Sequence, residues 1–119
     1  MKDFFDDIKL VATDIGGTLT RDDGSISELT VETLRSLQER GIIIALATGY
    51  NKEMTDNIAS QISDKLITII QNGAIVFDGD VLLETNYLDK DIALQVVEFF
   101  ESKNFSPILF SGLDNNCKT

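Results

Sequence analysis

One short segment near the N-terminus most constrains how this chain can fold. Residues 10–20 read Leu-Val-Ala-Thr-Asp-Ile-Gly-Gly-Thr-Leu-Thr, so an apolar run leads directly into Asp14, two glycines and a threonine. Ligands of open parallel sheets bind beyond the carboxyl ends of the strands, and glycines let main-chain N–H groups approach an anion closely. We therefore expect a strand over residues 8–13, with Asp14 at its end and the amides of Gly16 and Gly17 beside it.

The rest of the chain alternates between strand and helix patterns. Strands are predicted over residues 42–47, 66–70 and 106–110, together with a hairpin over 74–84 that turns at Asp78-Gly79-Asp80. Helices are predicted after the capping residues Ser27 and Asn51 and after Asp89 or Asp91, and a small flap turns at Asp23-Gly24. This order is typical of an α/β fold with a parallel sheet, and the first strand reads as its central strand, covered on both faces.

Apolar spacing also predicts which helix faces are buried. The expected inward residues are Met54, Ile58 and Ile62 in one helix and Ile92, Val96, Val97 and Phe100 in another. The phenylalanines at 99, 100, 105 and 110 read as packing residues, and the residues after them read as a polar tail.

Composition excludes several classes of function. The formal net charge of −10 over 119 residues opposes contact with nucleic acid or an anionic membrane. With one cysteine, Cys117, and no histidine, the chain offers neither a disulfide framework nor the usual zinc ligands. No apolar run reaches membrane-spanning length and no signal peptide is recognised, so the cytoplasm is the expected compartment.

Three segments in order resemble motifs of the haloacid dehalogenase-like phosphohydrolases. Asp14 to Thr20 resembles the first motif, Asp-x-Asp-Gly-Thr-Leu/Val-x, and the apolar run ending at Thr48-Gly49 resembles the second. Gln71-Asn72-Gly73-Ala74 resembles the Asn-Gly-Ala element of the sugar-phosphatase branch with a large cap, often called Cof-type. One such match is weak evidence, but three in order, each after a predicted strand, are specific.

The resemblance implies a fold and a division into domains. The chain is expected to hold the N-terminal half of a Rossmann-like three-layer αβα core with a parallel sheet, plus a β-hairpin and the beginning of an α+β cap. Residues 1–86 are the expected partial core, and residues 87–119 are the beginning or a remnant of the cap. In the family another strand pairs beside the first, so here that flank is expected to lie open and to favour homo-oligomer formation.

The resemblance also implies a mechanism and a set of site residues. Asp14 is the expected nucleophile in Mg²⁺-dependent hydrolysis of a small phosphorylated metabolite of the sugar-phosphate type, through an aspartyl-phosphate. The expected phosphate-binding residues are Gly16, Gly17, Thr18, Thr48 and Gly49. The Asp14 carboxylate and the Gly16 carbonyl are expected metal ligands, and Asn72 is a turn residue that could also contact substrate.

Departures from the family pattern leave other functions open. Gly16 replaces the second aspartate of the first motif, Tyr50 stands where the capped branch commonly has arginine, and the family's later lysine and acidic cluster lie beyond this sequence. Turnover and Mg²⁺ binding are therefore expected to be weak or absent in this chain alone. The alternative is a catalytically inactive truncated relative that binds phosphate or a protein partner, while a dinucleotide-binding module is disfavoured because Gly-x-Gly-x-x-Gly is missing.

Overall fold

The computed structural model describes residues 4–110 and 117–118 of the chain. The chain divides into two compact units, Met1–Thr85 and Asn86–Thr119. The two units are described separately below.

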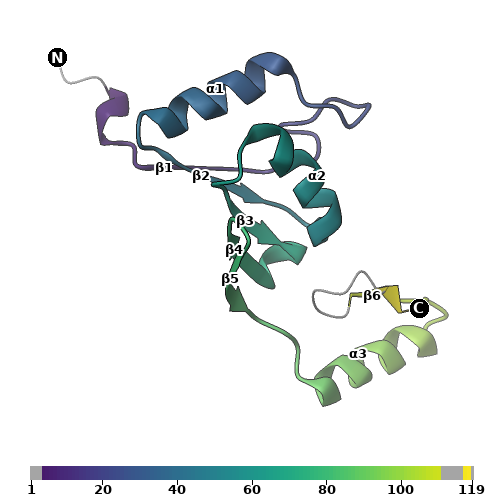
Figure 1. Ribbon diagram of the computed structural model, residues 1–119. Helices are drawn as coiled ribbons and strands as arrows, with labels where there is room; N and C mark the ends of the chain where they lie inside the picture. The colour runs from purple at the N-terminus through teal and green to yellow at the C-terminus, as the bar shows by residue number, and fades with distance from the viewer. Residues whose placement is uncertain (1–3, 111–116, 119) are drawn as a thin grey trace. The chain divides into compact units, whose positions relative to one another are not determined.

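A mixed five-stranded sheet forms the first unit (Figure 1). Its strands are β1 (Leu10–Thr13), β2 (Ile43–Ala47), β3 (Ile67–Ile70), β4 (Ile75–Asp78) and β5 (Val81–Thr85). They lie in the order β1-β2-β3-β4-β5, with β1, β2 and β3 parallel and with β4 and β5 forming an antiparallel hairpin. The α/β fold with a parallel core and a hairpin is therefore confirmed.

Two helices cover one face of this sheet, and they begin at the predicted caps. Before α1 (Glu28–Glu39), the Ser27 side chain accepts a hydrogen bond from the Thr30 amide, and before α2 (Lys52–Ile62), Asn51 accepts one from Met54. Both helices contribute to one core cluster with β1 and β2, formed by the residues Val11, Leu34, Ile44, Leu46, Ile58 and Ile62. On the other face, Leu10 and Ile43 are 52% and 50% exposed, so the described residues form two of the three expected layers.

One residue of the predicted buried face of α2 lies elsewhere. Met54 is 48% exposed, whereas Thr55 is fully buried and its hydroxyl donates to the Asn51 carbonyl at 2.8 Å. The prediction for Met54 was wrong because the buried hydroxyl is satisfied by the capping residue itself. A polar side chain can therefore take the inward position in the first turn.

The position of β1 also differs from the sequence prediction. Among the described residues, β1 lies at one edge of the sheet, and its burial alternates between exposed and half-buried positions. It is therefore neither central nor covered on both faces in the described part of the chain. Its flank is open, as the family resemblance implied.

The second unit contains α3 (Lys90–Ser102), capped by Asp89, and the short antiparallel strands β6 (Leu109–Phe110) and β7 (Cys117–Lys118). Of the residues expected on the buried face of α3, Val97 is half-buried, whereas Ile92 and Phe100 are 52% and 42% exposed. The phenylalanines contact one another through edge-to-face ring pairs, as Phe100 does with Phe105 at 6.4 Å between centroids. The prediction of buried side chains was wrong because no described residue of this unit covers the apolar stripe.

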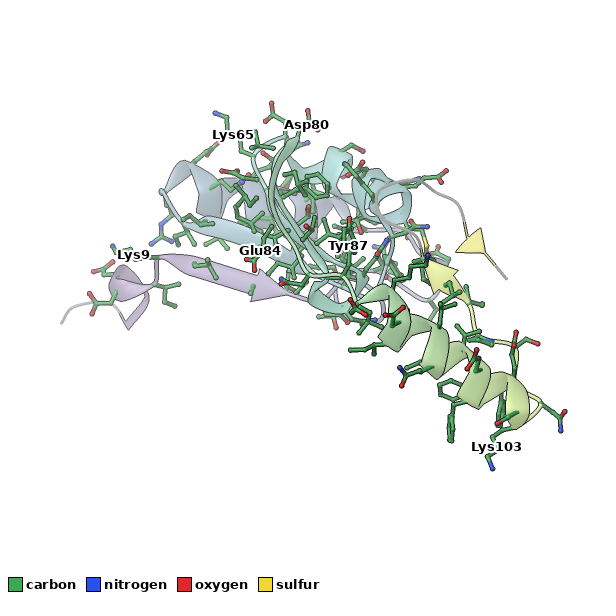
Figure 2. All side chains as sticks on the ribbon, turned by 90° about the horizontal axis from the view of Figure 1, so that it is seen from below. Lys9, Lys65, Asp80, Glu84, Tyr87 and Lys103 are labelled. Atoms are coloured by element: carbon green, nitrogen blue, oxygen red, sulfur yellow. The ribbon has the colours of Figure 1, made fainter. Side chains whose placement is uncertain are left out.

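The sequence predicts a polar tail after Phe110, but the structure places a short strand there, because β7 pairs with β6. Residues 111–116 and the Cys117 side chain lie outside the described part of the structure. Figure 2 shows the side chains of α3 projecting outward along its length, as far as Lys103 at its C-terminal end. None of the helices in the described part of the chain combines the length and the apolar character needed to span a bilayer.

Candidate functional site

The loop that follows β1 is organised around one buried residue. Ile15 is fully buried, and its carbonyl accepts hydrogen bonds from the amides of Thr18, Leu19 and Thr20 at 3.2, 3.0 and 3.1 Å. Asp14, the preceding residue, is exposed. The loop therefore wraps tightly around the Ile15 carbonyl while the Asp14 carboxylate remains accessible at the carboxyl end of the strand.

Hydrogen-bond donors lie next to this carboxylate. The Thr18 hydroxyl donates to Asp14 Oδ2 at 3.4 Å, a long contact that leaves the carboxylate largely unengaged. Among the described residues, no intrachain acceptor engages the amides of Gly16 and Gly17. Gly17 has a φ of +72°, which favours glycine. The loop thus presents two unengaged N–H groups beside an exposed carboxylate.

Thr48 lies at the end of β2 and connects the loops around it. Its amide donates to the Ile69 carbonyl at 2.9 Å, and its hydroxyl accepts a hydrogen bond from the Tyr50 amide at 3.1 Å. The hydroxyl can still donate its own proton, although the residue is only 7% exposed. Thr48 does not cap α2, because Asn51 does so.

Gly49 and Asn72 come together between the loops after β2 and β3. Asn72 has a φ of +57° within the short helical turn η2 (Gln71–Gly73), and its amide donates to the Thr48 carbonyl at 3.1 Å. A side chain on Gly49 would place its Cβ 3.0 Å from the Asn72 amide oxygen. Asn72 therefore forms the turn, as predicted, and its side chain also covers the adjacent loop.

The sequence did not reveal that Tyr50 and Gly16 are in contact. A Cβ atom on Gly16 would lie 2.7 Å from the Tyr50 hydroxyl oxygen and 3.3 Å from Cζ, so the phenol occupies the space that a side chain would need. Both residues are departures from the family pattern, which is the only sign in the sequence that could have linked them. The structure places the two departures against each other.

The flap after this loop is held by hydrogen bonds to the carboxylate of Asp23. An isolated antiparallel bridge joins Thr20 and Ile26, and Asp23 accepts hydrogen bonds from the Ser25 hydroxyl and amide at 2.6 and 2.9 Å. These two bonds, the hydroxyl first, lower the pKa of the Asp23 carboxyl below its ordinary value. Asp23 is therefore a turn residue, as the sequence indicated.

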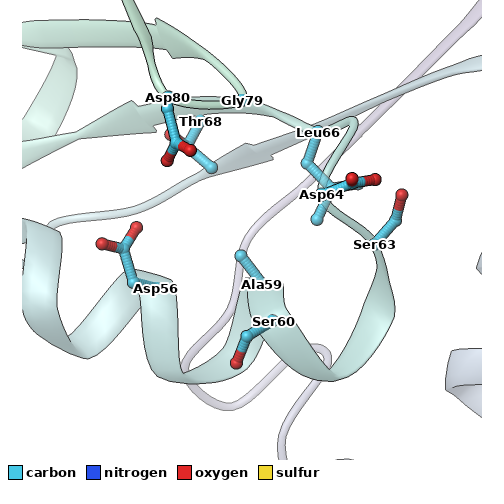
Figure 3. Close-up of a pocket in the computed structure, with 9 residues that line it drawn as sticks. All are labelled: Asp56, Ala59, Ser60, Ser63, Asp64, Leu66, Thr68, Gly79 and Asp80. Atoms are coloured by element: carbon cyan, nitrogen blue, oxygen red, sulfur yellow. The ribbon is translucent and has the colours of Figure 1, made fainter.

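One cavity of the first unit lies away from the candidate residues. It has a volume of about 350 Å³ and extends from α2 to the β4–β5 turn, where Lys65 and Asp80 lie at the same end of the unit (Figure 2). Figure 3 shows the Asp56 and Asp80 carboxylates pointing toward one another across it, with Asp64 nearby. Three carboxylates would repel a phosphate, so this cavity is a poor candidate for the phosphate site.

Comparison with known proteins places this geometry in a family. The sequence model of the haloacid dehalogenase-like hydrolases matches residues 11–118. The chain belongs to this family.

Individual haloacid dehalogenase-like hydrolases and other relatives resemble the chain over a limited length. A phosphoglycolate phosphatase of Methanopyrus kandleri is 37% identical over 76 residues, covering 64% of this chain and 33% of the relative. Phosphatase YwpJ of Bacillus subtilis is 29% identical over 106 residues, covering 88% of this chain and 37% of the relative. The chain therefore spans about a third of the length of these curated relatives.

A solved structure gives the same result for the fold. A haloacid dehalogenase-like hydrolase from B. subtilis superposes with a TM-score of 0.75 at 30% sequence identity, over 82% of this chain and 34% of that one. The architecture built from β1 to β5 is thus the architecture of part of a haloacid dehalogenase-like hydrolase.

The described residues offer Mg²⁺ a partial ligand set. Across the described ranges, no group of three or more His, Cys, Asp or Glu side chains is placed to hold a metal ion. Mg²⁺ commonly binds proteins through one or two carboxylates and completes its shell with water and substrate phosphate. The exposed Asp14 carboxylate fits that mode, because its only side-chain hydrogen bond among the described residues is the long one from Thr18.

Proposed function

We propose that this chain carries the phosphoryl-binding part of a Mg²⁺-dependent phosphohydrolase that acts on a small phosphorylated metabolite of the sugar-phosphate type. Residues 1–86 would form part of the core and residues 87–119 the beginning of a cap, as in the Cof-type branch. We place the protein in the cytoplasm. The observation that carries the proposal is the exposed Asp14 at the end of β1, beside the unengaged amides of Gly16 and Gly17.

Each site residue has a defined part in the proposed reaction. An Asp14 oxygen attacks phosphorus in line with the leaving oxygen, forming an aspartyl-phosphate that water then hydrolyses to regenerate the carboxylate. The amides of Gly16 and Gly17 and the hydroxyls of Thr18 and Thr48 donate to the phosphoryl oxygens, which carry the negative charge in the transition state. Gly49 and Asn72 shape the wall next to Thr48.

A bound Mg²⁺ ion would neutralise part of the phosphoryl charge. The Asp14 carboxylate and the Gly16 carbonyl are the groups of this chain that would hold it. Position 16 has no side chain that can protonate the leaving group, and such general acid assistance contributes about 10²- to 10⁴-fold. We therefore expect slow hydrolysis by this chain alone, with the greatest loss for leaving groups that require a proton.

The proposal is tested by phosphate release from p-nitrophenyl phosphate and a hexose phosphate in the presence of Mg²⁺. Asp14→Asn is expected to reduce release to the uncatalysed rate, because the amide is a poor nucleophile. Asp22→Asn, which removes a carboxylate from the exposed flap, is the matched control and should leave the rate unchanged. Mass spectrometry after acid quenching should find a single phosphoryl group, attached to Asp14.

Equal release by the wild-type chain and Asp14→Asn would overturn the proposed mechanism. Saturable phosphate binding without any Asp14-dependent release would instead support the inactive, phosphate-binding alternative.

A further inference from the structure

We propose that the Tyr50 hydroxyl is a hydrogen-bond donor of the phosphoryl site, acting from the space that the absent side chain at position 16 leaves open. This inference rests on the proposed function, because it assigns one more ligand contact to the same site. It predicts that a bound phosphate dianion accepts a hydrogen bond from the phenol.

The backbone of Tyr50 is fixed on both sides. Its amide donates to Thr48 Oγ1 at 3.1 Å, and its carbonyl accepts a hydrogen bond from the Gln71 amide at 3.0 Å. The next residue, Asn51, caps α2. The half-buried Tyr50 side chain also packs against the core cluster of the first unit. The backbone that carries the ring is therefore held by hydrogen bonds to the loops after β2 and β3, and the ring itself packs against the core.

The contact with Tyr50 explains why residue 16 is a glycine. Gly16 is not among the glycines with positive φ, so its backbone conformation is open to other residues. A Cβ atom there would nevertheless lie 2.7 Å from the Tyr50 hydroxyl, a distance that real Cβ atoms essentially never show. A side chain at position 16 and the phenol at position 50 thus exclude each other in this arrangement.

The chemistry of the phenol suits an anionic ligand. The hydrogen bonds among the described residues involve the amide and carbonyl of Tyr50 but not its hydroxyl. A phenol hydroxyl can donate a hydrogen bond, and hydrogen bonds to charged acceptors are about twice as strong as neutral ones. From the loop after β2, the hydroxyl thus adds one more uncharged donor beside Gly16, next to the amides of Gly16 and Gly17.

The sequence offers a direct measurement, because the chain has two tyrosines and no tryptophan. Chain labelled with ¹³C at tyrosine Cζ should give two NMR signals, one from Tyr50 and one from Tyr87 in the second unit. Titration with inorganic phosphate and Mg²⁺ should shift the Tyr50 signal with the same saturation curve as the Gly16 and Gly17 amides. The Tyr87 signal serves as an internal control and should not move.

Substitution separates a binding role from a packing role. Tyr50→Phe removes the hydroxyl and keeps the ring, and it should weaken phosphate binding about tenfold or more, as expected for a lost hydrogen bond to a charged group. Tyr87→Phe should bind as the wild type does. The amide spectrum outside the loops after β1 and β2 should be unchanged in both variants, which shows that the fold is retained.

Two results would overturn the inference, and they are distinguishable. If phosphate shifts the Gly16 and Gly17 amides while the Tyr50 signal stays fixed and Tyr50→Phe binds within twofold of the wild type, the phenol only packs and the proposed function stands. If phosphate produces no saturable shift at Gly16, Gly17 or Tyr50, there is no phosphoryl site, and the proposed function fails together with this inference.

Discussion

At the scale of single residues, the adjacent glycines Gly16 and Gly17 differ in what a side chain would meet at each position. Gly17 has a φ of +72°, a conformation that residues with side chains rarely adopt, and no described residue other than its chain neighbours comes within 4 Å of the position of its Cβ. Gly16 has an ordinary backbone, but its Cβ position is taken by Tyr50. A carboxylate side chain at position 16 would therefore have to displace the hydroxyl end of the Tyr50 side chain.

This difference predicts that Gly16→Ala changes the free energy of unfolding differently in the wild-type chain and in a Tyr50→Ala chain. Gly16→Ala should cost about 1–3 kcal/mol in the wild-type chain, because the added methyl group overpacks against the phenol. In a Tyr50→Ala background the same substitution should be neutral or should stabilise by about 0.4–1 kcal/mol, because alanine restricts the unfolded chain more than glycine does. Urea unfolding followed by the amide signals of the first unit measures both values.

Gly17→Ala provides the matched control for this cycle. It should destabilise the first unit in both backgrounds, because its cost comes from the positive φ and not from Tyr50. An equal cost of Gly16→Ala in the two backgrounds would show that Tyr50 does not exclude a side chain there.

At the scale of helices and strands, the sequence predicted where helices begin better than it predicted which elements cover them. Ser27, Asn51 and Asp89 all cap helices as their sequence context indicated, because a cap depends on the backbone groups within one turn. The covering of β1 and of α3 was not predictable, because an apolar stripe specifies that something can cover it but not which element does so. The contact between Tyr50 and Gly16 was missed for the same reason, since it joins two loops that are distant in sequence.

The cap of α2 yields a prediction confined to that element. Asn51→Ala should destabilise the first unit by about 1 kcal/mol, because the Met54 amide loses its acceptor at 2.9 Å. Asn57→Ala makes the same change at an exposed position within the helix, where alanine is the better helix former, and should cost nothing. Equal losses in the two variants, measured by urea unfolding, would argue against the capping role.

At the scale of the whole molecule, the sheet of the first unit has the parallel strand β1 at one edge. Among the described residues, β1 has a neighbour only in β2, and Leu10 on this strand is 52% exposed. An apolar edge with free backbone groups favours pairing with another chain. The candidate site lies at the carboxyl end of this same strand, so the loop that holds Asp14 is fixed to the sheet from one side.

We therefore predict self-association that depends on concentration. Sedimentation velocity should show species larger than the monomer as concentration rises, and Leu10→Lys should suppress them, because a charge at an edge strand opposes pairing. Leu29→Lys, at a 74% exposed position on α1, is the matched control and should leave association unchanged. A monomer at all concentrations would contradict this use of the open edge.

The pairing of β1, β2 and β3 in sequence order also bears on when the site can form during synthesis. The residues of the candidate site come from the loops after these three strands, and each strand lies beside the next one along the chain. Each parallel pair is closed by a crossover that contains a helix, as between Leu10 and Ile43, and such non-local pairing forms slowly. We therefore expect a nascent polypeptide to lack this region until β3 has left the exit tunnel of the ribosome and all three strands can pair.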